Sequence, residues 1–120
     1  MIRHTGTKIS LCLFVAAASL AAAWLPSRAH AAAENLYEAD FSSNTIVKFA
    51  PDGSSSTFAA GLNGPVGLAF DGAGNLFQAD YSSGIIFKFT PDGTKSTFAS
   101  GLNGPIALAF DRSGNLLVAD

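Results

Sequence analysis

Three aspartates recur at equivalent places along the chain and could together bind a cation. Asp40, Asp80 and Asp120 each end an Ala-Asp pair. Carboxylate oxygens are the ligands that calcium prefers, so a ring of them at one end of a fold could hold a metal ion. In the simpler interpretation, each carboxylate accepts hydrogen bonds from backbone N–H groups of its own turn. We favour turn caps, because these aspartates recur at equivalent places. A structural role recurs in this way, whereas a binding site usually uses different residues at equivalent positions.

A second pair of aspartates superficially resembles a calcium loop. Asp71 and Asp111 begin the segments Asp-Gly-Ala-Gly-Asn and Asp-Arg-Ser-Gly-Asn. Both segments lack the alternating oxygen ligands and the distal Glu that such a loop requires. We therefore expect turn caps here too, with Gly74 and Gly114 in left-handed turn positions, and we expect no metal site and no cofactor.

Four neutral residues are the candidates for ligand contact. Asn63 and Asn103 precede Gly-Pro, and their side chains could face a central channel, although Asn beside Gly is also common in turns. Phe41 and Tyr81 directly follow Asp40 and Asp80, and could stack on a ligand or pack against the next loop.

The N-terminal segment over 1–31 has the three-part pattern of a secretory signal peptide. Arg3 and Lys8 precede an uncharged stretch over residues 9–25, and Ala29-His30-Ala31 offers small residues for cleavage. The stretch is shorter than the roughly 20 residues that span a bilayer, which disfavours a retained membrane anchor. We expect a helical signal peptide over 1–31 and an exported chain over 32–120, either periplasmic or extracellular. A retained anchor and a misread start remain alternatives.

Cleavage of the signal peptide would remove every His and Cys side chain from the exported chain. Both His residues and the single Cys of the 120-residue chain lie before residue 32, so residues 32–120 hold no His or Cys nucleophile, general base or zinc ligand. The same segment carries nine acidic and four basic side chains, which argues against nucleic-acid and other anionic partners.

An internal repeat determines the fold class. Residues 35–74 and 75–114 align without a gap at 26 of 40 identical positions, and a third copy begins at 115–120. Each repeat holds four short runs of strand-forming residues, separated by turns such as Pro-Asp-Gly. We therefore predict an all-β chain of four-stranded antiparallel β-propeller-type blades, with about two repeats of 40 residues.

The fourth run of each repeat has a large and a small face. Leu68 and Phe70 point to one side, and Gly67 and Ala69 to the other, as expected for a β-strand. The large face of one strand packed against the small face of the next would let neighbouring blades approach closely near the central axis of a propeller. The polar third run, such as 95–99, suits a solvated outer edge.

The repeat resembles the NHL-repeat β-propeller family, and is similar also to the six-bladed propellers of the gluconolactonase and senescence-marker-protein group. The matching residues are Pro65, Gly67, Leu68, Ala69, Phe70, Asp71, Gly74, Asn75, Leu76, Ala79, Asp80, Ile86, Lys88 and Phe89. The resemblance implies that the run beginning at Gly-Pro is the innermost strand of a blade. Residues 32–120 would then supply three strands of a first blade, all four of a second and two of a third.

The resemblance also bears on activity. Gluconolactonase-like enzymes place Asn or Asp metal ligands directly before Gly-Leu-Ala, where this chain has Val66 and Ile106. Streptogramin-lyase-like propellers, whose repeats are similar, depend on His. We therefore expect an exported propeller fragment with a non-catalytic binding or scaffolding role toward a protein, glycan or small ligand. The alternative is an incomplete portion of a gluconolactonase-like metal-dependent hydrolase.

About two blades are too few to close the circular arrangement of a propeller. Six blades need about 240 residues, so the chain would be a fragment of a larger propeller, or several copies would assemble into one ring. A non-functional truncated product is a further alternative. We expect no membrane contact once the signal is cleaved.

Overall fold

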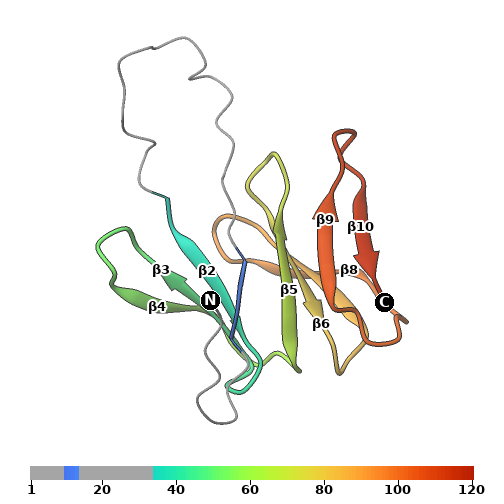
Figure 1. Ribbon diagram of the computed structural model, residues 1–120, viewed down its shortest axis with the longest axis horizontal. Helices are drawn as coiled ribbons and strands as arrows, with labels where there is room; N and C mark the ends of the chain where they lie inside the picture. Colours follow the sequence, from blue (N-terminus) through green and yellow to red (C-terminus); the bar gives the residue numbers. More distant parts are fainter. Residues whose placement is uncertain (1–9, 14–33) are drawn as a thin grey trace.

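The computed structural model describes residues 10–13 and 34–120, and this part of the chain is all-β (Figure 1). The first sheet has the order β1-β2-β3-β4, with bounds Ser10–Leu13, Leu36–Asp40, Thr45–Phe49 and Ser55–Ala59. The middle sheet has the order β5-β6-β7-β8, with bounds Pro65–Phe70, Leu76–Asp80, Ile85–Phe89 and Lys95–Ala99. The last sheet pairs β9 (Ala107–Phe110) with β10 (Leu116–Ala119). All pairings are antiparallel, as predicted for propeller-type blades.

The strand β1 was not predicted. Ser10–Leu13 pairs with β2 in the register Ser10 to Asp40 and Leu13 to Tyr37, where the middle sheet has its innermost strand β5. The helical form expected for the signal segment is therefore wrong for these four residues, because the edge of β2 offers unpaired N–H and C=O groups to an extended segment. The rest of the expected signal peptide lies outside the described residues. Within the described ranges, no helix has the length and apolar character needed to cross a membrane.

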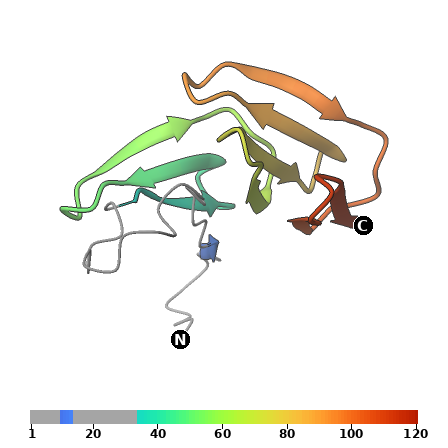
Figure 2. The same ribbon diagram turned by 90° about the horizontal axis from the view of Figure 1, so that it is seen from above.

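The three sheets stack face against face, with β5 between β2 and β9 (Figure 2). The middle sheet turns Leu68, Leu76 and Phe89 toward the first sheet, and all three are buried there with Ala39 and Ile46. Its opposite face turns Ala69, Phe77, Ala79 and Ile86 toward Leu108 of the last sheet. The outer strands β4 and β8 are mostly exposed, as the polar third run predicts.

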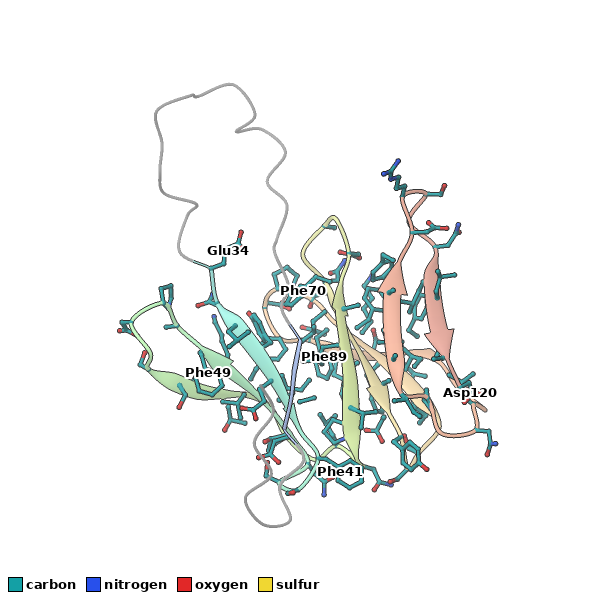
Figure 3. The ribbon with its side chains drawn as sticks, viewed as in Figure 1. Glu34, Phe41, Phe49, Phe70, Phe89 and Asp120 are labelled. Carbon is teal, nitrogen blue, oxygen red and sulfur yellow. The ribbon has the colours of Figure 1, made fainter. Side chains whose placement is uncertain are left out.

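An aromatic contact repeats between successive sheets. The ring of Tyr37 on β2 lies 5.0 Å from that of Phe70 on β5, and Phe77 on β6 lies 5.1 Å from Phe110 on β9 (centroid to centroid). Both pairs are edge-to-face, an arrangement that favours aromatic attraction. Because the second pair occupies the same positions of the next repeat as the first pair, the sequence repeat is also a repeat of the packing between sheets. Figure 3 shows the side chains of Phe70 and Phe89 in the space between the sheets.

The small face of β5 permits a close approach between the middle and last sheets. A Cβ atom on Gly67 would lie 2.6 Å from the carbonyl oxygen of Ile106 and 3.2 Å from the Cα of Ala107. Both are backbone atoms, which cannot rotate away. The large-against-small packing predicted from the sequence is therefore present between β5 and β9.

One buried polar side chain in the middle sheet has no hydrogen-bond partner. Gln78 on β6 is completely buried, and neither its Oε1 nor its Nε2 forms a hydrogen bond. The third repeat has Val118 at the equivalent position, packed against an apolar cluster. An amide buried without partners costs free energy of folding that an apolar side chain of the same size avoids.

We predict that Gly67→Ala destabilises the protein by about 1–3 kcal/mol, because the added methyl group forces β5 and β9 apart. Chemical denaturation of the full chain measures this change. Gly72→Ala is the matched control, because a Cβ at Gly72 meets no atom within 4 Å and its φ is not in the left-handed region. Equal losses of stability in the two variants would contradict the packing described here.

We predict that Gln78→Met stabilises the protein by about 1 kcal/mol, because it removes an unpaired buried amide and nearly preserves the volume. The midpoint of urea unfolding should rise. A lower midpoint would mean that the amide of Gln78 has a partner in solution.

Candidate functional site

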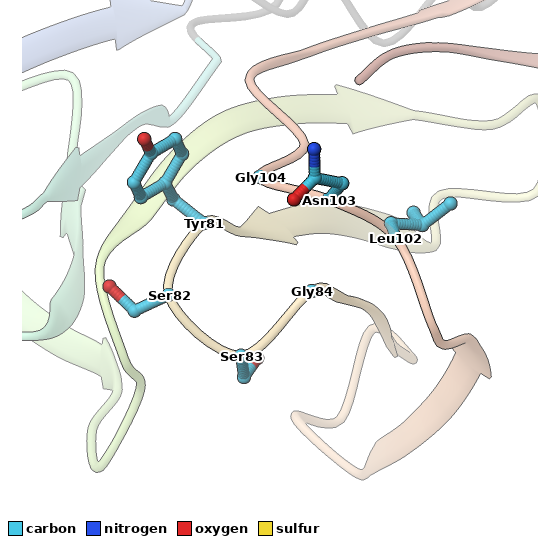
Figure 4. Close-up of a pocket in the computed structure, with 7 residues that line it drawn as sticks. All are labelled: Tyr81, Ser82, Ser83, Gly84, Leu102, Asn103 and Gly104. Carbon is cyan, nitrogen blue, oxygen red and sulfur yellow. The ribbon is translucent and has the colours of Figure 1, made fainter.

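The candidate site is a pocket between two loops at the lower end of the sheets in Figure 1. One wall is the turn Tyr81–Gly84, which joins β6 to β7, and the other is the link Leu102–Gly104, which leads from β8 to β9. The pocket has a volume of about 280 Å³. Figure 4 shows the two walls, with Tyr81 and Asn103 on facing loops.

The two walls are held together by backbone contacts. The N–H of Leu102 donates a hydrogen bond to the carbonyl oxygen of Gly84 at 3.0 Å. Gly84 has a φ of 67°, and a Cβ there would collide with the carbonyl oxygen of Leu102. Asn44, the equivalent residue of the preceding repeat, has a φ of 57°, and its carbonyl oxygen accepts the same bond from the N–H of Leu62 at 3.1 Å, so both repeats join these loops in the same way.

Tyr81 packs its ring against the opposite wall. An atom placed at the Cβ position of Gly104 would lie 2.9 Å from Cε2 of the Tyr81 ring, and Gly64 has the same relation to Phe41 at 2.8 Å. Packing against the next loop is therefore realised at both aromatic residues. Tyr81 still exposes 46% of its surface. Its hydroxyl is the feature that Phe41 lacks.

Asn63 and Asn103 have equivalent backbone roles but different surroundings. The N–H of Asn63 donates to Oδ2 of Asp80 at 2.8 Å, and that of Asn103 donates to Oδ1 of Asp120 at 2.7 Å. Both side chains are exposed. Only Asn103 lines the pocket, together with Tyr81. Of the four sequence candidates the structure thus brings two together, while Asn63 and Phe41 lie on the preceding pair of loops.

The aspartates at the strand ends hold these loops in place. Asp40 accepts hydrogen bonds from the N–H groups of Ser42 and Ser43 at 2.9 and 3.1 Å, within its own turn. Asp80 is 1% exposed and divides its oxygens between the hydroxyl of Ser83 and the N–H of Asn63. The bond to Asn63 spans 17 residues and joins the end of β6 to the link before β5. Asp80 therefore fixes the loop geometry and is not available to a ligand.

Asp71 and Asp111 form identical turns at the opposite end of the sheets. Asp71 accepts bonds from the N–H groups of Ala73 and Asn75 and from the Asn75 side chain, and Asp111 does the same with Ser113 and Asn115. Burial raises the pKa of Asp71, but these bonds and the charge of Lys88 outweigh it and lower its pKa overall. The pKa of Asp111 is lowered mainly by the Asn115 side chain. Gly74 and Gly114 have φ values of 84° and 85°, the left-handed positions expected.

The positions where a gluconolactonase-like enzyme would place metal ligands hold hydrocarbon side chains. Val66 packs against the cluster between the middle and last sheets, and Ile106 is 53% exposed. Within residues 10–13 and 34–120, no group of three or more His, Cys, Asp or Glu side chains is placed to hold a metal ion.

Five pocket residues were not sequence candidates, namely Ser82, Ser83, Gly84, Leu102 and Gly104. The repeat could have suggested all of them except Gly84, because Ser82, Ser83, Leu102 and Gly104 recur as Ser42, Ser43, Leu62 and Gly64. Their meeting depends on a contact between loops that sequence spacing does not reveal.

No protein-family model matches the chain, and no curated protein matches it either. Several solved structures are similar to it. The virginiamycin B lyase from Staphylococcus aureus is similar with a TM-score of 0.64 and 13% identity, covering 73% of this chain and 31% of that one. A streptogramin B lyase is similar with a TM-score of 0.65 and 17% identity over the same shares.

A catalytically inactive variant of the Staphylococcus aureus virginiamycin B lyase, with quinupristin, is similar with a TM-score of 0.65 and 11% identity. That comparison covers 94% of this chain and 39% of the other. The chain thus spans about a third of the length of the structures it resembles. At these identities the likeness establishes the fold alone: the described sheets are blades of a β-propeller.

Proposed function

We propose that this chain is part of an exported β-propeller with a non-catalytic binding role, and that the pocket beside Tyr81 contacts the ligand. The observation that carries the proposal is the pocket's composition. Its lining side chains are all neutral, and its polar groups include the Tyr81 hydroxyl, the Ser82 hydroxyl and the Asn103 amide. Such a surface offers hydrogen bonds without a charged group to act as a general acid or base.

The charge of the chain supports a neutral ligand. Residues 32–120 carry nine acidic and four basic side chains, so an anionic ligand would meet a net repulsive field. Hydroxyl and amide groups beside an aromatic ring suit the hydroxyl-rich faces of a neutral saccharide. The proposed ligand class is therefore a neutral glycan.

The lyases with a similar fold suggest a different role, which we do not propose. Streptogramin-lyase-like propellers depend on His, and the portion of a propeller that residues 32–120 supply contains none. The competing function is a portion of a gluconolactonase-like metal-dependent hydrolase, for which Val66 and Ile106 stand at the expected ligand positions. Export rests on the pattern of residues 1–31.

We predict that the full chain binds neutral oligosaccharides on a glycan array, and that Tyr81→Phe and Asn103→Ala each weaken this binding about tenfold. A factor of ten is the loss expected when one hydrogen bond of about 1.4 kcal/mol is removed. Tyr81→Phe is informative because Phe41 shows that a phenylalanine ring packs on the equivalent glycine.

Ser96→Ala, on the exposed outer strand β8, is the control and should bind as the unmodified chain does. Absence of binding to any neutral oligosaccharide, or equal losses in all three variants, would overturn the proposal.

We predict that calcium and zinc bind to the full chain no more tightly than millimolar, because the aspartate oxygens are occupied by backbone and side-chain donors. Isothermal titration calorimetry with the chloride salts measures this. Micromolar binding would favour the metal-dependent hydrolase over the binding role.

A further inference from the structure

The pocket wall contains an Asn-Gly pair, and the same pair occurs once more in the preceding repeat. Asn103 and Gly104 follow one another on the link from β8 to β9 (Figure 4), and Asn63 and Gly64 do so on the link before β5. Both pairs lie in the sequence Gly-Leu-Asn-Gly-Pro. Gly64 and Gly104 have similar φ values of 73° and 85°, and both Asn side chains are exposed. The chain thus holds two copies of one local structure.

The two copies differ in what binds the backbone N–H of the glycine. The N–H of Gly64 donates a hydrogen bond to Oδ1 of Asn44 at 2.8 Å. The residue equivalent to Asn44 is Gly84, which has no side chain to accept such a bond. Among the described residues, none accepts a hydrogen bond from the N–H of Gly104. The missing acceptor belongs to the turn after β6, inside the described part of the chain.

The nitrogen that follows an asparagine can react with the asparagine side chain. It attacks the side-chain carbonyl carbon, Cγ, as a nucleophile and closes a succinimide ring. Glycine favours this reaction because it has no Cβ to obstruct the approach and gives the backbone wide freedom to turn. A hydrogen bond from the N–H to Asn44 holds the peptide group of Gly64 in place, so that bond must break before the ring can close. Gly104 has no such restraint.

We propose that Asn103 is a site of spontaneous deamidation, from which Asn63 is protected by Asn44. In the first step the Gly104 nitrogen bonds to Cγ of Asn103 and the Cγ–Nδ2 bond breaks. Nδ2 leaves as ammonia and takes the proton of the Gly104 N–H. In the second step water adds to a carbonyl carbon of the succinimide. Attack at Cγ gives aspartate at position 103, and attack at the main-chain carbonyl carbon gives isoaspartate.

The modification changes the pocket beside Tyr81. The side chains that line this pocket are neutral, and the Asn103 amide is among its polar groups. Aspartate and isoaspartate each carry a carboxylate at neutral pH, so deamidation adds a negative charge and removes an amide donor. Isoaspartate also adds a methylene group to the main chain of the link. These changes follow from the pocket's composition, whatever ligand it binds.

The test is the rate of deamidation at each asparagine in the full chain. Peptide mass spectrometry of samples incubated in mildly alkaline buffer measures both rates. We expect Asn103 to react about tenfold faster than Asn63, which corresponds to one hydrogen bond of about 1.4 kcal/mol. In denaturant the two rates should be equal, because the residues around both sites are the same.

A substitution in the first repeat tests the role of the acceptor. Asn44→Gly introduces the residue that the second repeat has at this position, and glycine readily adopts the left-handed φ of 57° found there. We expect the rate at Asn63 to rise to that at Asn103. Ser43→Ala is the matched control in the same turn. It removes a hydroxyl that contacts Thr45 and leaves the Asn44 side chain in place, so Asn63 should stay slow.

Equal rates at Asn63 and Asn103 in the folded chain would overturn the proposal. So would a rate at Asn63 that Asn44→Gly leaves unchanged, or a tenfold difference that persists in denaturant. The measurement uses no ligand, so this proposal and the binding role can fail independently.

Discussion

The structure depends on one packing contact, in which the small face of one sheet lies against the large face of the next. The two sheets approach closely where Gly67 meets the backbone of Ile106. Single sheets of this size cannot exclude water from both faces, so their stability comes from burial between sheets. The recurrence of Tyr37 with Phe70 and of Phe77 with Phe110 makes each contact a copy of the last. The repeated residues are therefore those through which neighbouring blades pack against and stabilise one another.

The candidate site is a consequence of this stacking. The pocket lies beside the turn after β6 and the link into β9, and those segments belong to neighbouring sheets held together by the same contact. The buried carboxylate of Asp80 joins the end of β6 to the link before β5 and stabilises these loops. Neutral side chains are left to line the pocket, and the proposed binding role rests on them.

The sequence was sufficient for the strands, the turns and the alternation of large and small faces, because these follow from local spacing. It could not reveal the reach of Asp80 to Asn63 across 17 residues, since that bond depends on how two loops approach. The pairing of Ser10–Leu13 with β2 was also missed, because an apolar segment satisfies an export signal and a strand edge equally well. The complete burial of Gln78 also depends on the neighbouring sheet, which local spacing does not reveal.

Nuclear Overhauser contacts between aromatic rings in the full chain test the stacking of sheets most directly. The account predicts cross-peaks between Tyr37 and Phe70 and between Phe77 and Phe110, whose ring centres lie 5.0 and 5.1 Å apart. Contacts confined to rings of the same sheet, such as Tyr37 with Phe58, would contradict it.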